Sequence, residues 1–105
     1  QEIEISEMRE HNNDLFIKTT KDEVFELDMF LNLKKKFTSV HEQLLFYKEY
    51  IVDITNGMLI FEHLVSDEIK QIPFKDISFE ELKINGNSFY FSNNKEISVY
   101  EFNPG

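Results

Sequence analysis

Residues 51–61 of this chain read IVDITNGMLIF, and this stretch decides the fold. Two apolar runs rich in β-branched residues flank the pair Asn56-Gly57. Such a pair accepts a positive φ at both central positions of a type I′ turn, whose twist matches that of the adjoining strands. The stretch therefore predicts a tight antiparallel β-hairpin.

The same device recurs along the second half of the chain. Asn85-Gly86 separates two short alternating runs, and Asn93-Asn94 is predicted to turn the chain into a last strand over residues 97–102. Residues 68–72 also alternate, and Pro73 marks the end of that strand or an edge position, because proline cannot donate to a sheet ladder. Residues 44–102 are therefore predicted to form an antiparallel meander of about five strands.

Residues 21–36 fit two interpretations. Thr20 with Glu23 forms a capping box, and the lysines at 34–36 would place favourable charge at the C-terminus of a helix. The same segment also alternates apolar and polar residues as a strand does, with Phe30 as the break in the pattern. The charge pattern favours the helix, and the strand stays open as the alternative.

These segments together predict an α+β or mostly-β fold. We expect one domain over residues 1–105, in which a mixed strand and helix segment (1–43) precedes the meander (44–102). The expected architecture is an antiparallel meander of about five to seven strands with one helix, and a barrel-like closure is one form that such a meander takes.

Composition limits the classes of function. The 105 residues hold 11 Lys+Arg against 20 Asp+Glu, a formal net charge of -9, which disfavours binding to duplex nucleic acid. There is no cysteine, so disulfides and sulfur-ligated zinc sites are excluded. The 3 glycines are too few and too scattered for a phosphate-binding loop or a dinucleotide motif, and we expect no cofactor.

Residues suited to catalysis or metal binding are few. His11, His41 and His63 have no histidine partner at the spacing that a helix or strand needs for a metal site. The adjacent acid pairs at 22–23, 67–68 and 80–81 fit turns and helix starts better than a catalytic cleft. We therefore expect no catalytic residue, no metal ligand and no enzymatic activity, and a small enzyme or metal protein is the least favoured alternative.

A protein partner is the favoured expectation. The bulky residues that lie off the inward register of the predicted strands are Phe30, Tyr47, Tyr50 and Tyr90. Exposed aromatic clusters are typical of protein contact sites, so these residues are the predicted partner-binding surface. We expect a membrane contact only through a segment upstream of Gln1, and the sequence leaves localisation and oligomeric state open.

Residues 44–102 resemble the β portion of bacterial PH-like domains. The resemblance rests on Tyr50-Ile51-Val52-Asp53, on Gly57-Met58-Leu59-Ile60, and on the stretch from Ile69 to Ile77 with its Ile-Pro-aromatic-x-Asp-Ile turn. The chain departs from that family by lacking its closing C-terminal helix near Pro104 and by carrying some 40 residues in front. The resemblance implies a scaffold for protein or membrane-surface interaction, with no catalytic residues.

A second resemblance is to the heads of minor pilins in Gram-positive competence or type IV pilus systems. In that family a helix precedes an antiparallel meander, so this interpretation requires residues 1–36 to be largely helical. The function expected first is a non-enzymatic binding domain of the protein-interaction, inhibitor or immunity kind. The alternative is an extracytoplasmic structural subunit such as a minor pilin head.

Overall fold

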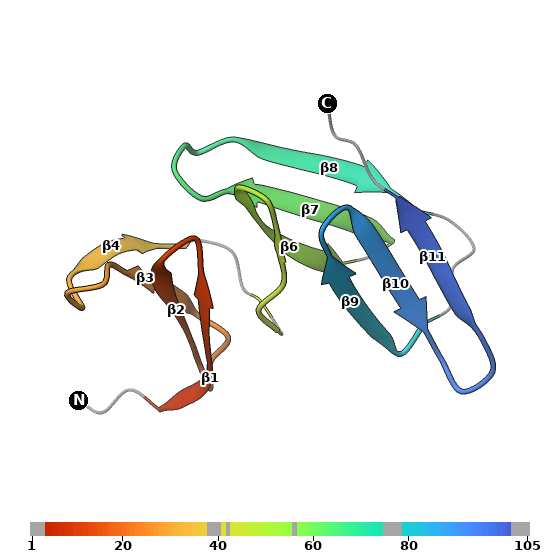
Figure 1. Cartoon of the computed structure of the whole chain (residues 1–105), viewed down its shortest axis with the longest axis horizontal. Coiled ribbons are helices and arrows are strands. Elements are labelled where there is room, and N and C mark those ends of the chain that lie inside the picture. Colours follow the sequence, from red (N-terminus) through yellow and green to blue (C-terminus); the bar gives the residue numbers. More distant parts are fainter. Residues whose placement is uncertain (1–3, 38–40, 42, 56, 75–78, 102–105) are drawn as a thin grey trace. The chain divides into compact units, whose positions relative to one another are not determined.

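The computed structural model describes residues 4–37, 41, 43–55, 57–74 and 79–101. The chain divides into two compact units, residues 1–44 (unit 1) and residues 45–105 (unit 2). Within the described residues the regular elements are eleven strands, which form three antiparallel sheets (Figure 1). The expected antiparallel strands are therefore confirmed.

Unit 1 holds one four-stranded sheet with the order β1-β2-β3-β4. The strands are β1 (Ile5–His11), β2 (Asp14–Thr19), β3 (Val24–Leu27) and β4 (Leu33–Lys36). The first hairpin turns at Asn12 and Asn13, whose φ angles of 51° and 68° are the pair of positive values that a type I′ turn needs. Asparagine tolerates this left-handed conformation better than other residues with a side chain.

The helix expected over residues 21–36 was wrong, since the described part of the chain contains no helix and this segment forms β3 and β4. The capping-box interpretation failed because the polar residues form a turn instead of a helix start. The Thr19 hydroxyl accepts hydrogen bonds from the amides of Lys21 and Glu23 at 3.2 and 3.3 Å. Asp22, in the same turn, has a φ of 61°. The alternating pattern predicted the correct type of element but not its bounds or register, since β3 ends at Leu27 and buries Val24 and Glu26 rather than Phe25. The helical segment that the pilin interpretation requires is thus not found in the described residues of 1–36.

Unit 2 holds the other two sheets. One has the order β5-β6-β7-β8, and the other has the order β11-β10-β9. Their strands are β5 (Phe46–Tyr47), β6 (Tyr50–Thr55), β7 (Met58–His63), β8 (Ile69–Pro73), β9 (Glu81–Asn85), β10 (Ser88–Ser92) and β11 (Ile97–Glu101). Every hydrogen-bonded pair of strands is consecutive in sequence and antiparallel, as predicted, but the expected single meander is divided into two sheets because the described strands β8 and β9 do not pair.

The turns of this meander lie close to their predicted places. Thr55 pairs with Met58, so the loop between them spans positions 56–57. Gly57 has a φ of 75°, and Asn56 lies outside the described residues. In the next such hairpin the loop is Gly86-Asn87 rather than Asn85-Gly86, because Asn85 pairs with Ser88. The positive φ of 60° at Gly86, the first loop position, is the pattern of a type II′ turn.

The remaining strand ends follow the predictions. Pro73 is the last residue of β8, an edge strand in the sheet order. The Asn93 side chain accepts hydrogen bonds from the amides of Lys95 and Glu96 at 2.8 and 3.0 Å, which turns the chain into β11. The predicted extension of this strand to Phe102 lies outside the described residues.

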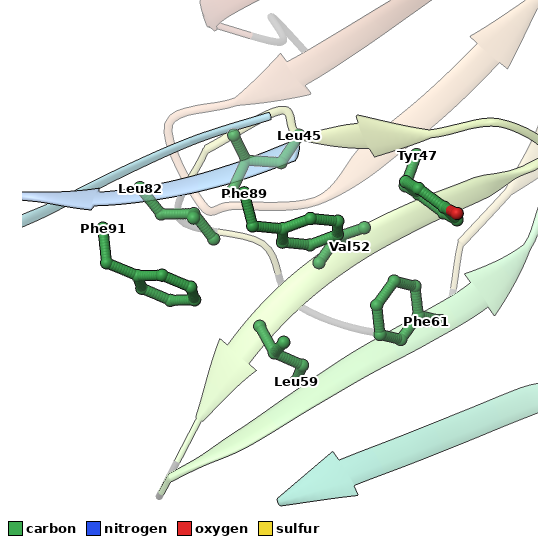
Figure 2. Packing of buried hydrophobic residues seen from close by; sticks show 8 residues of the cluster. All are labelled: Leu45, Tyr47, Val52, Leu59, Phe61, Leu82, Phe89 and Phe91. Atoms are coloured by element: carbon green, nitrogen blue, oxygen red, sulfur yellow. The ribbon is translucent and has the colours of Figure 1, made fainter. Parts of the chain in front are cut away.

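The core of unit 2 lies between its two sheets (Figure 2). Phe61 from one sheet and Phe89 from the other have ring centroids 6.0 Å apart, and the Tyr47 ring lies 5.4 Å from that of Phe89. The other members of the cluster are Leu45, Val52, Leu59, Leu82 and Phe91. The described strands form sheets with open edges and no closed barrel, so the expectation of barrel closure was wrong.

Candidate functional site

The most exposed apolar residues of unit 1 lie on the loop that joins β3 to β4. Met29, Phe30 and Leu31 are 70%, 78% and 67% exposed. They are consecutive in sequence, between Asp28 and Asn32, and we call residues 29–31 the apolar loop. Three adjacent large apolar side chains in water are unusual, because exposed apolar residues on monomeric proteins are mostly single.

Asp28 holds this loop in one conformation. Its Oδ1 accepts hydrogen bonds from the amides of Phe30 and Asn32 at 2.9 and 2.8 Å, and its Oδ2 accepts one from the Asn32 side chain at 3.3 Å. The backbone adds two bonds of 2.9 Å, from the Asp28 amide to the Asn32 carbonyl and from the Leu31 amide to the Asp28 carbonyl. The backbone hydrogen bond from Asn32, with a further one from Phe30, lowers the pKa of the Asp28 carboxyl.

The loop also contains a strained residue. Leu31 has a φ of 66°, in the left-handed region that large side chains disfavour. Such a conformation persists where the surroundings over-determine it, and here the hydrogen bonds to Asp28 and Asn32 do so. The apolar loop is therefore ordered before any contact forms, which reduces the entropy that a partner must overcome on binding.

A charged cluster lies on the strands that carry the loop. Asp14 of β2, Glu26 of β3 and Lys34 of β4 belong to adjacent strands, and the Lys34 ammonium lies 2.6 Å from Asp14 and 3.7 Å from Glu26. Burial raises the pKa of Glu26 to about 7, and a hydrogen bond with Asp14 acts in the same direction. That hydrogen bond, together with one from Lys34, lowers the pKa of Asp14. Below about pH 7 the two carboxyls therefore hold one proton between them.

The lysines of β4 are engaged by neighbouring groups. Lys34 pairs with Asp14 and Glu26, Lys36 lies 3.3 Å from the carboxylate of Glu23, and the Lys35 ammonium lies 4.8 Å from the centroid of the Phe37 ring. The lysine run predicted as a helix C-terminus is thus an edge strand whose charges are met within its own unit. Lysine on an edge strand also discourages pairing with other chains.

The predicted partner-binding residues occupy four different environments. Phe30 is on the apolar loop, whereas Tyr47 is 1% exposed and belongs to the core of unit 2. Tyr50 is half-buried, its ring edge-on to that of His63 at 5.1 Å and its hydroxyl 3.3 Å from Glu68. Tyr90 is half-buried opposite Val99 and Lys83. Phe30, Tyr50 and Tyr90 remain predicted contact residues, and Tyr47 is not at the surface.

Sequence reasoning found Phe30 but missed its neighbours. Met29 and Leu31 fit the alternating pattern of a strand, although Asp28 and Asn32 flank the three apolar residues. Asp and Asn at such positions commonly close loops through their side chains. This flanking pair was the signal that identifies residues 28–32 as a loop.

Within the described residues no cluster of three or more His, Asp or Glu side chains is arranged to hold a metal ion. His63 lies at the end of β7, where its Nδ1 accepts hydrogen bonds from the amides of Val65 and Ser66 at 3.2 and 3.1 Å. In the same described part of the chain, no helix has the length and apolarity required to cross a bilayer.

Comparisons with protein-family models, with curated proteins and with solved structures found no match. The function is therefore argued from the geometry of the site.

Proposed function

We propose that this chain is a non-enzymatic protein-binding module, of the interaction, inhibitor or immunity kind, and that the apolar loop is its contact site. The observation that carries the proposal is the exposure of Met29, Phe30 and Leu31 on a loop that Asp28 holds in place. Contact energy in protein interfaces concentrates in a few large side chains that enter a pocket on the partner.

The energy available at this loop is sufficient for specific binding. Burying a Leu, Met or Phe side chain fully is worth about 1.5–3 kcal/mol. Residues 29–31 would therefore contribute several kcal/mol before the costs of association, and the ordered backbone limits those costs. An apolar pocket large enough for a phenyl ring is the feature that we expect on the partner.

A protein surface fits this loop better than a lipid surface does. Anionic lipid is attracted by free cationic charge next to an apolar anchor. Here the neighbouring lysines Lys34 and Lys36 already pair with acids, and the chain carries a net charge of -9. The resemblance to PH-like domains agrees with a binding role, but the proposal rests on the loop and does not depend on that scaffold.

Site-specific photo-crosslinking tests the proposal. The photoreactive residue p-benzoylphenylalanine is placed at Phe30 in one sample and at Val65 in the control, and each protein is added to a lysate of its source cell. Val65 is 81% exposed on the loop between β7 and β8, so it reports random encounters with an equally exposed apolar position. We expect a single stoichiometric protein adduct from position 30 that is absent from position 65.

The substitution Leu31→Asp provides the second readout. It keeps the loop length but places a charge among the contact residues, so the adduct from position 30 should fall at least tenfold. Equal labelling from positions 30 and 65, or an adduct that Leu31→Asp leaves unchanged, would show that the apolar loop is not a contact site.

A further inference from the structure

The three-stranded sheet of unit 2 ends on β11, which pairs with β10 on one side. The strand reads ISVYE over residues 97–101. Ile97 and Val99 are 69% and 54% exposed and point to the same face of the sheet, since residues two apart in a strand share a face. On its other side, no strand in the described part of the chain pairs with β11.

The hydrogen-bonding direction of β11 follows from the two hairpins before it. Asn85 and Ser88 flank a two-residue loop and therefore exchange hydrogen bonds, so Ser88, Tyr90 and Ser92 direct their backbone groups to β9. The bond of 3.0 Å from the Asn93 amide to the Glu96 carbonyl confirms the alternation on the other side. It follows that Ser98 and Tyr100 bond to β10, while Ile97, Val99 and Glu101 present their amides and carbonyls outward.

Other sheet edges carry features that discourage pairing, and β11 does not. The edge strand β4 has three lysines, β8 ends in Pro73, β5 is two residues long, β9 carries Lys83, and β1 has a register shift between Ile5 and Glu7. Lysine, proline, short length and bulges are the devices by which natural sheets protect their edges. β11 has a regular register, no proline and no lysine, and its sequence favours strands.

We propose that β11 pairs with β11 of a second copy of this chain, antiparallel and with Val99 facing Val99 on the two-fold axis. In this register Ile97 faces Glu101 of the second copy and Ser98 faces Tyr100 of the second copy. The outward backbone groups of Ile97, Val99 and Glu101 then close into hydrogen-bonded pairs, which joins the two three-stranded sheets into one continuous sheet.

The symmetry of β11 about Val99 suits a second copy of the strand, and the position of Glu101 selects the register. The two exposed Val99 side chains meet at the centre of the paired segment, and each Glu101 carboxylate lies at one end of it, opposite Ile97 of the other copy. If the register of the two β11 strands shifted so that Glu101 lay on the two-fold axis, the two Glu101 carboxylates would face each other, which is unfavourable across a strand pair. The strand is thus complementary to itself without any sequence supplied by another protein.

The contact is small, so the dimer is expected to be weak, with a dissociation constant on the order of 0.1 mM. Each copy carries a net charge of -9, and mutual repulsion opposes association at low salt. Raising the salt concentration screens that repulsion, so dimerisation should become stronger between 50 mM and 500 mM NaCl. Sedimentation analysis of the full chain over about 10 µM to 1 mM measures both effects.

Val99→Pro is the discriminating variant. Proline has no amide hydrogen, and the amide hydrogen of Val99 points away from β10. The substitution therefore keeps the hydrogen bonds between β10 and β11 but blocks pairing with a second copy. Val99→Lys is the companion variant, which keeps the backbone intact and adds a charge at the centre of the contact. Both should raise the dissociation constant at least tenfold, and Val65→Lys, at a still more exposed valine outside the sheet, should leave it unchanged.

Cysteine pairing tests the register, since the natural chain contains no cysteine. Ser98 and Tyr100 of the second copy form a non-hydrogen-bonded pair with Cα atoms about 4.5 Å apart, within the range for a disulfide. A mixture of Ser98→Cys and Tyr100→Cys chains should therefore yield a disulfide-linked heterodimer, whereas each variant alone should not. A chain that is monomeric throughout the concentration range, or a dimer unaffected by both Val99 variants, would overturn the proposal.

Discussion

Replacement of Glu26 by glutamine should remove much of the pH dependence of stability in unit 1. The pKa of Glu26 is raised from its ordinary value of 4.5 to about 7 because the carboxyl is buried and shares a hydrogen bond with Asp14. The folded chain therefore holds this proton more tightly than the unfolded chain. The stability that this proton contributes is fully present below pH 4.5 and falls as the pH rises through about 7, because the unfolded chain releases the proton while the folded chain must keep it or bury a charged carboxylate.

The magnitude follows from the two pKa values. A tenfold difference in proton affinity is worth about 1.4 kcal/mol, so the change from 4.5 to about 7 corresponds to a loss of about 3 kcal/mol in the free energy of unfolding by pH 8. Glutamine mimics the protonated carboxyl and donates to Asp14 at every pH. Glu26→Gln should therefore match the natural chain near pH 4.5 and exceed its stability by up to about 3 kcal/mol at pH 8.

Urea unfolding of the full chain at several pH values between 4.5 and 8, followed at the amide signals of β2 and β3, measures this difference. Glu23→Gln is the matched control, because Glu23 directly precedes β3 but is half-exposed and pairs with Lys36 at 3.3 Å. The control should retain the pH dependence. Parallel pH profiles for Glu26→Gln and the natural chain would refute the assignment of a shared proton to the Asp14–Glu26 pair.

Three further substitutions test the local structure. Asp28→Ala removes the acceptor of the Phe30 and Asn32 amides, so hydrogen exchange at both amides should speed up while exchange in β2 stays unchanged. Amides that remain protected in the variant would mean that Asp28 does not hold the loop. Phe89→Ala removes a ring from the centre of the unit 2 core and should lower the free energy of unfolding by about 3–5 kcal/mol in urea. A decrease below about 1 kcal/mol would be inconsistent with this packing. Gly86→Ala should lower the free energy of unfolding by about 1 kcal/mol in the same assay. The added Cβ meets no atom within 4 Å, but the φ of 60° disfavours alanine. An unchanged free energy of unfolding would contradict that turn geometry.

The second half of the fold could be predicted because its signals are local. An asparagine–glycine or asparagine-rich pair between alternating runs specifies a hairpin without help from distant residues, and β6–β7 and β10–β11 formed where expected. The one-residue displacement at Gly86 has a physical cause. Glycine is favoured wherever φ is positive, and a type II′ turn uses that freedom at its first position rather than its second.

The first half could not be predicted as well, because two local signals conflicted there. Thr20, Glu23 and the lysines at 34–36 suit the ends of a helix, while the alternation from Phe25 to Leu33 suits a strand. The sheet prevailed because it pairs β3 with neighbours on both sides and buries Val24. Such pairing involves residues distant in sequence, which capping patterns do not report.

The candidate site was only partly visible in the sequence for the same reason. Phe30 interrupted the strand pattern and was therefore noticed, but recognising residues 28–32 as an ordered loop requires knowing that β3 and β4 pair. Tyr47 lies off the inward register that the alternating pattern predicts, but the strand here is only two residues long and both of its residues are buried. The burial of Tyr47 depends on Phe61 and Phe89, which approach it from two other strands.

Backbone NMR of the full chain across residues 20–37 examines the hairpin that presents residues 29–31. Cross-strand nuclear Overhauser contacts should join Phe25 to Lys36 and Glu26 to Lys35, with extended chemical shifts on both sides of Asp28. Continuous helical shifts from residue 21 to residue 36, without those contacts, would eliminate the ordered loop and with it the proposed contact site.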